Sequence, residues 1–332
     1  MELLRTGRAD IEVAELKELV AETLFPGNGP RDDPKEVTWA AYYERYALGK
    51  RTRSYRESCL YTLAKMRQLC EGFHSLRFGD ITLAWLRDFD ARLAASGMSV
   101  NTRNIHFKNI RTCLNRAIDE ELTDNYPFRR FKIRPEATRK RNLPVGELRR
   151  LFGYGVEPYQ EYYLDYFKLI FMLVGINAID LFRLTAVENG RVEYRRAKTH
   201  KLYSVKVEPE AQAIIDRHRG KRALLDAADR WSDHRDFVKN CNIALQKIGT
   251  VERHGLGGSK EIVPEWPGLT TYWARHTWAT VAYSLGISKD VIAQALGHED
   301  GHEVTNIYIS EDPEKVDEAN RRVLDWVLYG RR

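Results

Sequence analysis

The sequence predicts a mainly α-helical protein of two domains, with a small antiparallel sheet in the second. Its 332 residues are enough for about two domains of roughly 150 residues each. Apolar residues recur at spacings of three and four over much of the chain, as they do in helices that bury one face. A basic segment with prolines near both ends, residues 127–144, interrupts this pattern and predicts the domain boundary.

Composition excludes several classes of protein. Hydrophobic residues make up 43% of the chain and charged residues 30%, as in folded globular proteins. The longest apolar run, residues 169–176, is less than half of the roughly 20 residues that a membrane span needs, so no membrane segment is expected. Residues 1–10 lack the apolar core of a secretory signal, which favours a cytoplasmic location. The four cysteines are widely spaced and are expected in the core, not as metal ligands or disulfides.

Charge is distributed unevenly along the chain. The net charge is +6, yet residues 51–141 contain 19 Lys and Arg against 10 Asp and Glu, a local net charge of +9. Residues 1–50 carry −3, and residues 142–332 are neutral. A basic half joined to a neutral half suits a protein that holds a polyanion through its phosphates, although a merely solvated basic face would have the same composition.

The first part of the chain is expected to form four helices behind a short appendage. A breaker at residues 25–30 separates an acidic helix, residues 11–23, from the rest, so residues 1–34 form the appendage. The first domain, residues 35–126, then contains helices at about 38–47, 55–73, 82–95 and 101–122. Thr82 can cap the third of these helices, and Gly97 can end it.

The fourth of these helices carries two stripes. Its core stripe is formed by Phe107, Ile110, Leu114, Ala117 and Ile118. A second stripe places cations and amides on another face, suited to phosphates and base edges, or else simply solvated. We expect contacts with a nucleic acid from this stripe and from the basic segment 127–144, namely from Asn104, Lys108, Arg111, Asn115, Arg129, Arg130, Lys132, Arg139, Lys140 and Arg141.

The second domain, residues 145–332, is expected to be mostly helical. A helix follows Pro144, and a long apolar helix covers about residues 159–174. Residues 192–197 and 202–207 predict a β-hairpin around a turn at 198–201. Helices are expected to dominate again from residue 210 to the end. The last helix, at 312–328, has an apolar stripe that packs either on its own domain or on a neighbouring protomer as an assembly helix.

Four short pieces of the second domain occur in one order and spacing. Residues 270–280 read TTYWARHTWAT and include Tyr272 and Arg275, while Ala-Leu-Gly leads into His298. Tyr308 follows ten residues after His298, and Lys198 lies in the predicted hairpin turn. These pieces resemble the H-x-x-R-H-T-x-A-T box, the L-G-H box, the tyrosine nucleophile and the hairpin lysine of the tyrosine recombinases, the phage integrase family. The resemblance covers about residues 35–325, because the first domain resembles the all-α, SAM-like core-binding domain of that family.

The resemblance implies a site-specific DNA recombinase that acts through a 3′-phosphotyrosyl intermediate. Tyr308 would be the nucleophile, Arg275 and His298 would bind phosphate oxygens, and Lys198 would protonate the leaving 5′ oxygen. Such chemistry needs no metal, ATP or other cofactor, because the phosphotyrosine retains the bond energy for religation. The implied partners are double-stranded DNA, a homotetramer on paired sites, and accessory DNA-bending or directionality proteins. The implied role is integration or excision of a mobile element.

Two positions depart from the family pattern. Asn177 stands where the family has the arginine of a G-x-R box, which removes one phosphate-binding cation. We expect Arg183 to replace that cation, with Arg191 and Arg195 as further candidates. Tyr272 stands where the family has a histidine; it can donate a hydrogen bond but is a poor base at neutral pH.

Three further points follow from these residues. Asp180 is expected to orient its neighbours and not to react. The missing arginine leaves open a catalytically impaired protein that only occupies recombination sites. Residues 298–303 concentrate metal-ligand types, but they lack the H-E-x-x-H order, which argues against a metal-dependent hydrolase.

Overall fold

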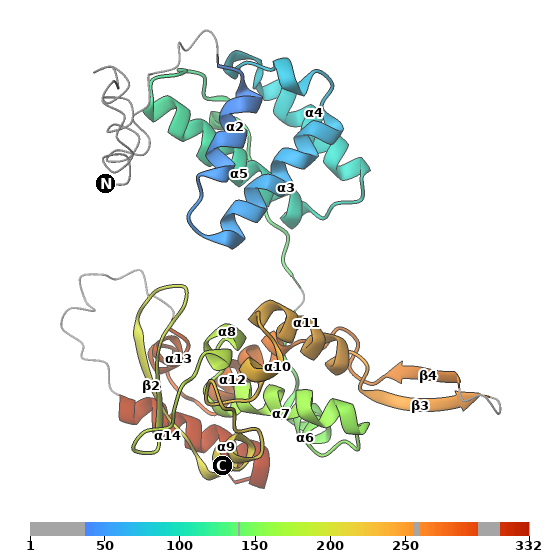
Figure 1. Ribbon diagram of the computed structural model, residues 1–332, viewed down its shortest axis with the longest axis vertical. Helices are drawn as coiled ribbons and strands as arrows, with labels where there is room; N and C mark the ends of the chain where they lie inside the picture. The colour runs from blue at the N-terminus through green and yellow to red at the C-terminus, as the bar shows by residue number, and fades with distance from the viewer. Residues whose placement is uncertain (1–36, 139, 255–258, 298–312, 332) are drawn as a thin grey trace, which may run out of the picture. The chain divides into compact units, whose positions relative to one another are not determined.

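The structure is a computed structural model that describes residues 37–138, 140–254, 259–297 and 313–331. The chain divides into two compact units, residues 1–138 and 139–332, and each forms its own hydrophobic core (Figure 1). The division falls inside the segment predicted as the linker. The predicted appendage, residues 1–34, lies outside the described residues.

The first unit is all-α, as the sequence predicted. Its elements are α2 (Trp39–Leu48), α3 (Arg53–Leu69), α4 (Leu83–Ala95) and α5 (Val100–Asp119), with short 3₁₀ turns at Phe73–Ser75, Phe78–Asp80 and Pro127–Arg129. Thr82 caps α4, since its side-chain oxygen accepts the Trp85 N–H at 3.1 Å. Gly97 follows the end of α4 with φ +80°, a left-handed backbone that favours glycine.

Helix α5 shows both stripes that its sequence predicted. Phe107, Ile110, Leu114 and Ala117 are buried in the core of the first unit, and Ile118 packs against it. On the other stripe, Lys108, Arg111 and Asn115 are exposed and Asn104 is half-buried. The amphipathic pattern therefore correctly predicted which face of α5 packs against the core and that Lys108 and Arg111 lie on the surface.

The first part of the predicted linker, residues 127–133, packs on the first unit, whereas the sequence predicted an extended linker. It begins with the 3₁₀ turn instead of extended chain, and Phe128 is only 5% exposed. Phe131 and Ile133 pack against the same core, and the Phe131 ring lies 4.7 Å from that of Phe107. Burial of these apolar side chains holds the backbone against the unit, while the alternating cations Arg129, Arg130 and Lys132 remain exposed.

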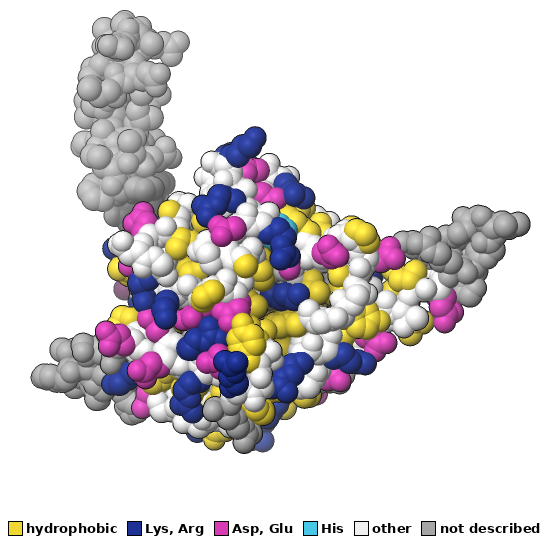
Figure 2. Space-filling model, turned by 90° about the horizontal axis from the view of Figure 1, so that it is seen from below, with side chains coloured by type: hydrophobic (Ala, Val, Ile, Leu, Met, Phe, Trp, Pro, Cys, Tyr) yellow, Lys and Arg dark blue, Asp and Glu magenta, His cyan; other side chains and the backbone are white. Residues whose placement is uncertain are grey.

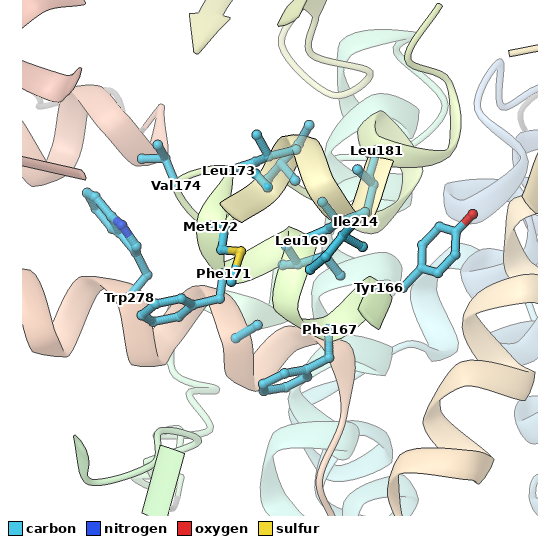
Figure 3. Packing of buried hydrophobic residues seen from close by; sticks show 14 of the residues in the cluster. Tyr166, Phe167, Leu169, Phe171, Met172, Leu173, Val174, Leu181, Ile214 and Trp278 are labelled. Carbon is cyan, nitrogen blue, oxygen red and sulfur yellow. The ribbon is translucent and has the colours of Figure 1, made fainter. Parts of the chain in front are cut away.

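In its described residues, the second unit is a mostly helical body with two antiparallel hairpins. Its helices are α6 (Val145–Phe152), α7 (Pro158–Met172), α8 (Ala178–Phe182), α9 (Pro209–Arg217), α10 (Ala227–Arg230), α11 (His234–Leu245), α12 (Thr271–Ser284), α13 (Lys289–Leu296) and α14 (Pro313–Leu324), the last followed by a π-helical turn, Asp325–Tyr329. Apolar residues of α7 form much of its core, and Trp278 of α12 and Ile214 of α9 belong to the same cluster (Figure 3). No described helix is long and apolar enough to cross a membrane.

The first hairpin was predicted and the second was not. Strands β1 (Arg191–Arg195) and β2 (Leu202–Lys206) pair antiparallel around the turn that contains Lys198. Strands β3 (Gly249–His254) and β4 (Ser259–Pro264) form a second hairpin that projects from the helical body, where helices had been expected (Figure 1). The expectation was wrong here because β-branched residues flank a glycine-rich stretch, which is a hairpin signal in itself.

The last helix packs on its own unit. Val316, Val323 and Leu324 of α14 are buried in the core. Asn320 of α14 accepts a hydrogen bond from the Trp278 indole N–H and donates one to the Met172 carbonyl, both at 2.9 Å. In the single chain, the apolar stripe of α14 therefore completes the core of the second unit. That this helix also serves as an assembly helix stays a prediction.

Candidate active site

Arg275 is the buried cation of the candidate site. It lies on α12, is 7% exposed, and donates from Nη1 to the Gly175 carbonyl at 2.6 Å and from Nη2 to the Leu296 carbonyl. Gly175 follows α7 with φ +69°, and a Cβ there would lie 2.9 Å from Cγ of Arg275. The glycine therefore lets the end of α7 and helix α12 approach closely enough to fix the guanidinium.

Asn177 lies at the position of the missing arginine and has a local structural role. It is the N-cap residue of α8, and its Nδ2 donates to Oδ2 of Asp180 at 3.3 Å. Asp180 is 3% exposed, and its Oδ1 accepts the backbone N–H of Ala197 at 2.9 Å. Asp180 thus ties the start of α8 to the β1–β2 turn, where the neighbouring Lys198 is exposed.

The same turn is tied to the end of α13 by a residue that the sequence analysis did not select. Arg196 donates from Nη1 to the carbonyl of Gly297 at 2.6 Å and to that of Leu296 at 3.3 Å. Gly297 ends α13 with φ +66°, and a Cβ there would come within 1.8 Å of the Tyr203 hydroxyl. Only glycine fits, so the end of α13 is held against the first hairpin immediately before His298.

Tyr272 lies one turn before Arg275 on α12 and is 49% exposed. Its ring meets the His276 ring edge-on at 4.6 Å. A hydroxyl on so exposed a side chain is accessible to a ligand from solvent.

The three candidates for a substitute cation have other surroundings. Arg183 is exposed at the C-cap of α8. Arg191 donates to Asp317 of α14 at 2.6 Å and to Ser204 at 2.7 Å, so it joins the hairpin to the last helix. Arg195 is exposed and, among the described residues, donates a hydrogen bond to the His200 carbonyl at 3.4 Å. No hydrogen bond or ion pair links any of the three to Arg275 within the described residues.

Arg196 carried a sequence signal that was overlooked. It directly follows β1 and precedes Lys198 by two residues, at the entry to the same turn. A cation so close to Lys198 in the sequence was therefore a candidate for the same site.

Burial lowers the pKa of Arg275, and the nearby Arg196 guanidinium lowers it further. Elsewhere, the face seen in Figure 2 mixes Lys and Arg with Asp and Glu instead of showing a field of one sign.

Part of the predicted site lies outside the described residues, namely residues 298–303 with His298, Tyr308, and Arg139 of the basic segment. Across the described part of the chain, no three His, Cys, Asp or Glu side chains gather as metal ligands would.

Comparison with known proteins adds a family domain and a set of related structures. Residues 38–133 match the family described as phage integrase SAM-like domain. The chain is similar to the Tn1549 transposon integrase in complex with a circular intermediate DNA, with 16% identity and a TM-score of 0.59 over 86% of this chain and 100% of that one. It is also similar to a lambda integrase tetramer bound to a Holliday junction, with 15% identity and a TM-score of 0.61 over 92% of this chain and 87% of that one. No curated protein sequence matches it significantly.

Proposed function

We propose that this chain, which has the fold of the tyrosine recombinases and a phage integrase SAM-like domain at residues 38–133, is a site-specific DNA recombinase. The integrases of similar fold were solved on DNA, which supports double-stranded DNA as its partner. We further propose that it acts in the cytoplasm and serves the integration or excision of a mobile element.

One observation carries the proposal. Three segments far apart in sequence meet in the second unit: α12 with Arg275, the turn with Lys198, and the end of α13 that runs into His298. A buried guanidinium and a solvent-exposed lysine on segments that meet suit phosphate chemistry, because the first can bind nonbridging oxygens and the second can transfer a proton.

The proposed reaction uses groups of the chain and of the DNA, with solvent as the proton acceptor. The Tyr308 oxygen attacks the scissile phosphorus and forms a P–O bond, while its proton passes to solvent. The bond from phosphorus to the 5′ oxygen breaks, and Lys198 gives its proton to that oxygen. Arg275 and His298 stabilise the charge of the transition state. Religation reverses these steps, so neither ATP nor a metal is consumed.

DNA binding is assigned to exposed cations and amides of the first unit. These are Asn104, Lys108, Arg111 and Asn115 on and beside the exposed face of α5, and Arg129, Arg130 and Lys132 after it; Arg139, Lys140 and Arg141 would follow the backbone beyond. The lambda integrase tetramer on a Holliday junction supports a tetramer of this chain on paired sites. Accessory bending or directionality proteins would complete the assembly.

Covalent trapping tests the proposal. The probe is a nicked suicide duplex built from the sequence that the full chain selects from a random DNA pool, incubated with EDTA and without ATP. The wild-type chain should form an adduct that survives denaturant, and Tyr308→Phe should form none while binding within severalfold. A wild-type chain that binds the duplex and never forms the adduct would support the alternative, a catalytically impaired occupant of recombination sites.

The role of Lys198 has a chemical control. Lys198→Ala should slow cleavage by ~10²–10⁴-fold, as expected for loss of a general acid, whereas Lys201→Ala in the same turn should not. A duplex with sulfur in place of the leaving 5′ oxygen should restore the rate of Lys198→Ala, because a thiolate leaves without protonation. Equal slowing on both duplexes would contradict the assignment.

A further inference from the structure

Arg196 and Arg275 converge on one main-chain oxygen. Nη1 of Arg196 and Nη2 of Arg275 both donate to the Leu296 carbonyl. Two hydrogen bonds to one atom keep these nitrogens within about 6 Å of each other. The two guanidinium groups come from a hairpin and from α12, about 80 positions apart in the sequence, so only the folded second unit brings them together.

Neither cation has an anionic partner in the described part of the chain. The hydrogen bonds of Arg275 and Arg196 go to the main-chain carbonyls of Gly175, Leu296 and Gly297. In addition, Nε of Arg196 is buried without a hydrogen-bond partner. Two adjacent, largely buried positive charges repel each other, and an unpaired buried donor is costly. Such an arrangement is stabilised when an anion with several oxygens binds to it.

We propose that Arg196 is the second phosphate-binding cation of the site and supplies the charge missing at Asn177. The inference rests on the proposed function and names one of its residues. Arg196 and Arg275 together would bind nonbridging oxygens of the scissile phosphate, with Lys198 two residues along the hairpin turn from Arg196. Asn177 instead donates a hydrogen bond to Asp180, and Arg191 is already paired with Asp317.

The first test compares rates on charged and neutral phosphates. On the suicide duplex, Arg196→Ala should cleave ~10²–10³-fold more slowly, as when one transition-state donor is lost, and Arg196→Lys should keep part of the rate. A methylphosphonate at the scissile position removes the negative charge that Arg196 neutralises, so the difference between Arg196→Ala and wild type should shrink to severalfold. A residue that only tethers Gly297 would slow both substrates equally, and that result would overturn the inference.

Matched variants separate Arg196 from the other cations. Arg183→Ala and Arg195→Ala remove the two rival candidates for the missing cation, and each should slow cleavage less than Arg196→Ala does. Arg219→Ala is the control that should cleave as the wild type does, because it removes a cation of α9's C-terminal loop that is bound to Asp216. If Arg183→Ala or Arg195→Ala loses the rate and Arg196→Ala does not, the assignment to Arg196 is wrong.

A second measurement does not depend on recombination. Thermal unfolding of the full chain is followed while inorganic phosphate replaces chloride at constant ionic strength. Phosphate should raise the melting temperature of the wild type and of Arg219→Ala, and the rise should be reduced in Arg196→Ala. An equal rise in Arg196→Ala would overturn the inference. If the wild type forms no adduct but phosphate binding depends on Arg196, the proposed function fails while the anion site stands.

Discussion

Replacing Gly175 with alanine tests how closely the end of α7 and helix α12 approach at the candidate site. Gly175 has φ +69°, and an added Cβ would lie 2.9 Å from Cγ, 3.0 Å from Cα and 3.1 Å from Cβ of Arg275. The substitution therefore combines a left-handed backbone with a steric overlap. Gly286, between α12 and α13, is a matched control because its φ is +76° and no heavy atom lies within 4 Å of the added Cβ.

The two substitutions should differ by the cost of the overlap. A left-handed alanine costs about 1–2 kcal/mol of stability at either position. Overpacking adds about 1–3 kcal/mol at Gly175, because backbone and inner side-chain atoms of Arg275 must move. We therefore expect a loss of about 2–5 kcal/mol for Gly175→Ala against about 1–2 kcal/mol for Gly286→Ala.

Hydrogen exchange of the full chain measures this difference within the second unit. Amides of α7 and α12 that exchange through unfolding of the unit report its free energy directly. Gly175→Ala should also lose covalent adduct formation under conditions where it is folded, since Arg275 is displaced, while Gly286→Ala keeps it. Equal destabilisation by both substitutions would refute the close approach on which the geometry of Arg275 depends.

Three further predictions concern Asp180, the basic residues 139–141 and Glu210. Asp180→Ala frees the β1–β2 turn and should slow cleavage of the suicide duplex by about 10–100-fold, since a hydrogen bond to a charged group is lost; Asp180→Asn keeps an acceptor oxygen, and an equal loss would argue against a positioning role. Alanine at all three of residues 139–141 should weaken binding to every duplex and reduce the salt slope by about one per lost phosphate contact, and an unchanged slope would exclude contact. Hydrogen bonding to Arg321 lowers the pKa of Glu210 from 4.5 to about 2, so the stability that this carboxylate contributes is present above about pH 4.5 and is lost as the pH falls toward 2. Between these pH values the free energy of unfolding, measured by urea titration, should therefore fall less in Glu210→Gln than in the wild type. The same pH dependence in both proteins would refute the Glu210–Arg321 pair.

Local patterns in the sequence were sufficient for most of the helices. The core stripe of α5, the cap at Thr82 and the β1–β2 hairpin each depend on residues only a few positions apart. Spacing and capping act over that range, so they can be recognised without the fold. The hairpin of β3 and β4 also had a local signal, a glycine-rich stretch between β-branched residues. This signal was given too little weight, and helices were expected there.

The residues around Arg275 were decided by contacts across the fold. Arg196 meets Gly297 across 101 positions, and Arg191 meets Asp317 across 126. Because these partners are far apart in the sequence, the sequence could not indicate that Arg191 is paired with a carboxylate and that Arg196 lies near Arg275. The motifs of the sequence selected Arg275 and Lys198 as site residues. Only the packing of the hairpin on α13 and α14 distinguished a cation with a structural partner from one without, because an ion pair depends on distance in space and not on order along the chain.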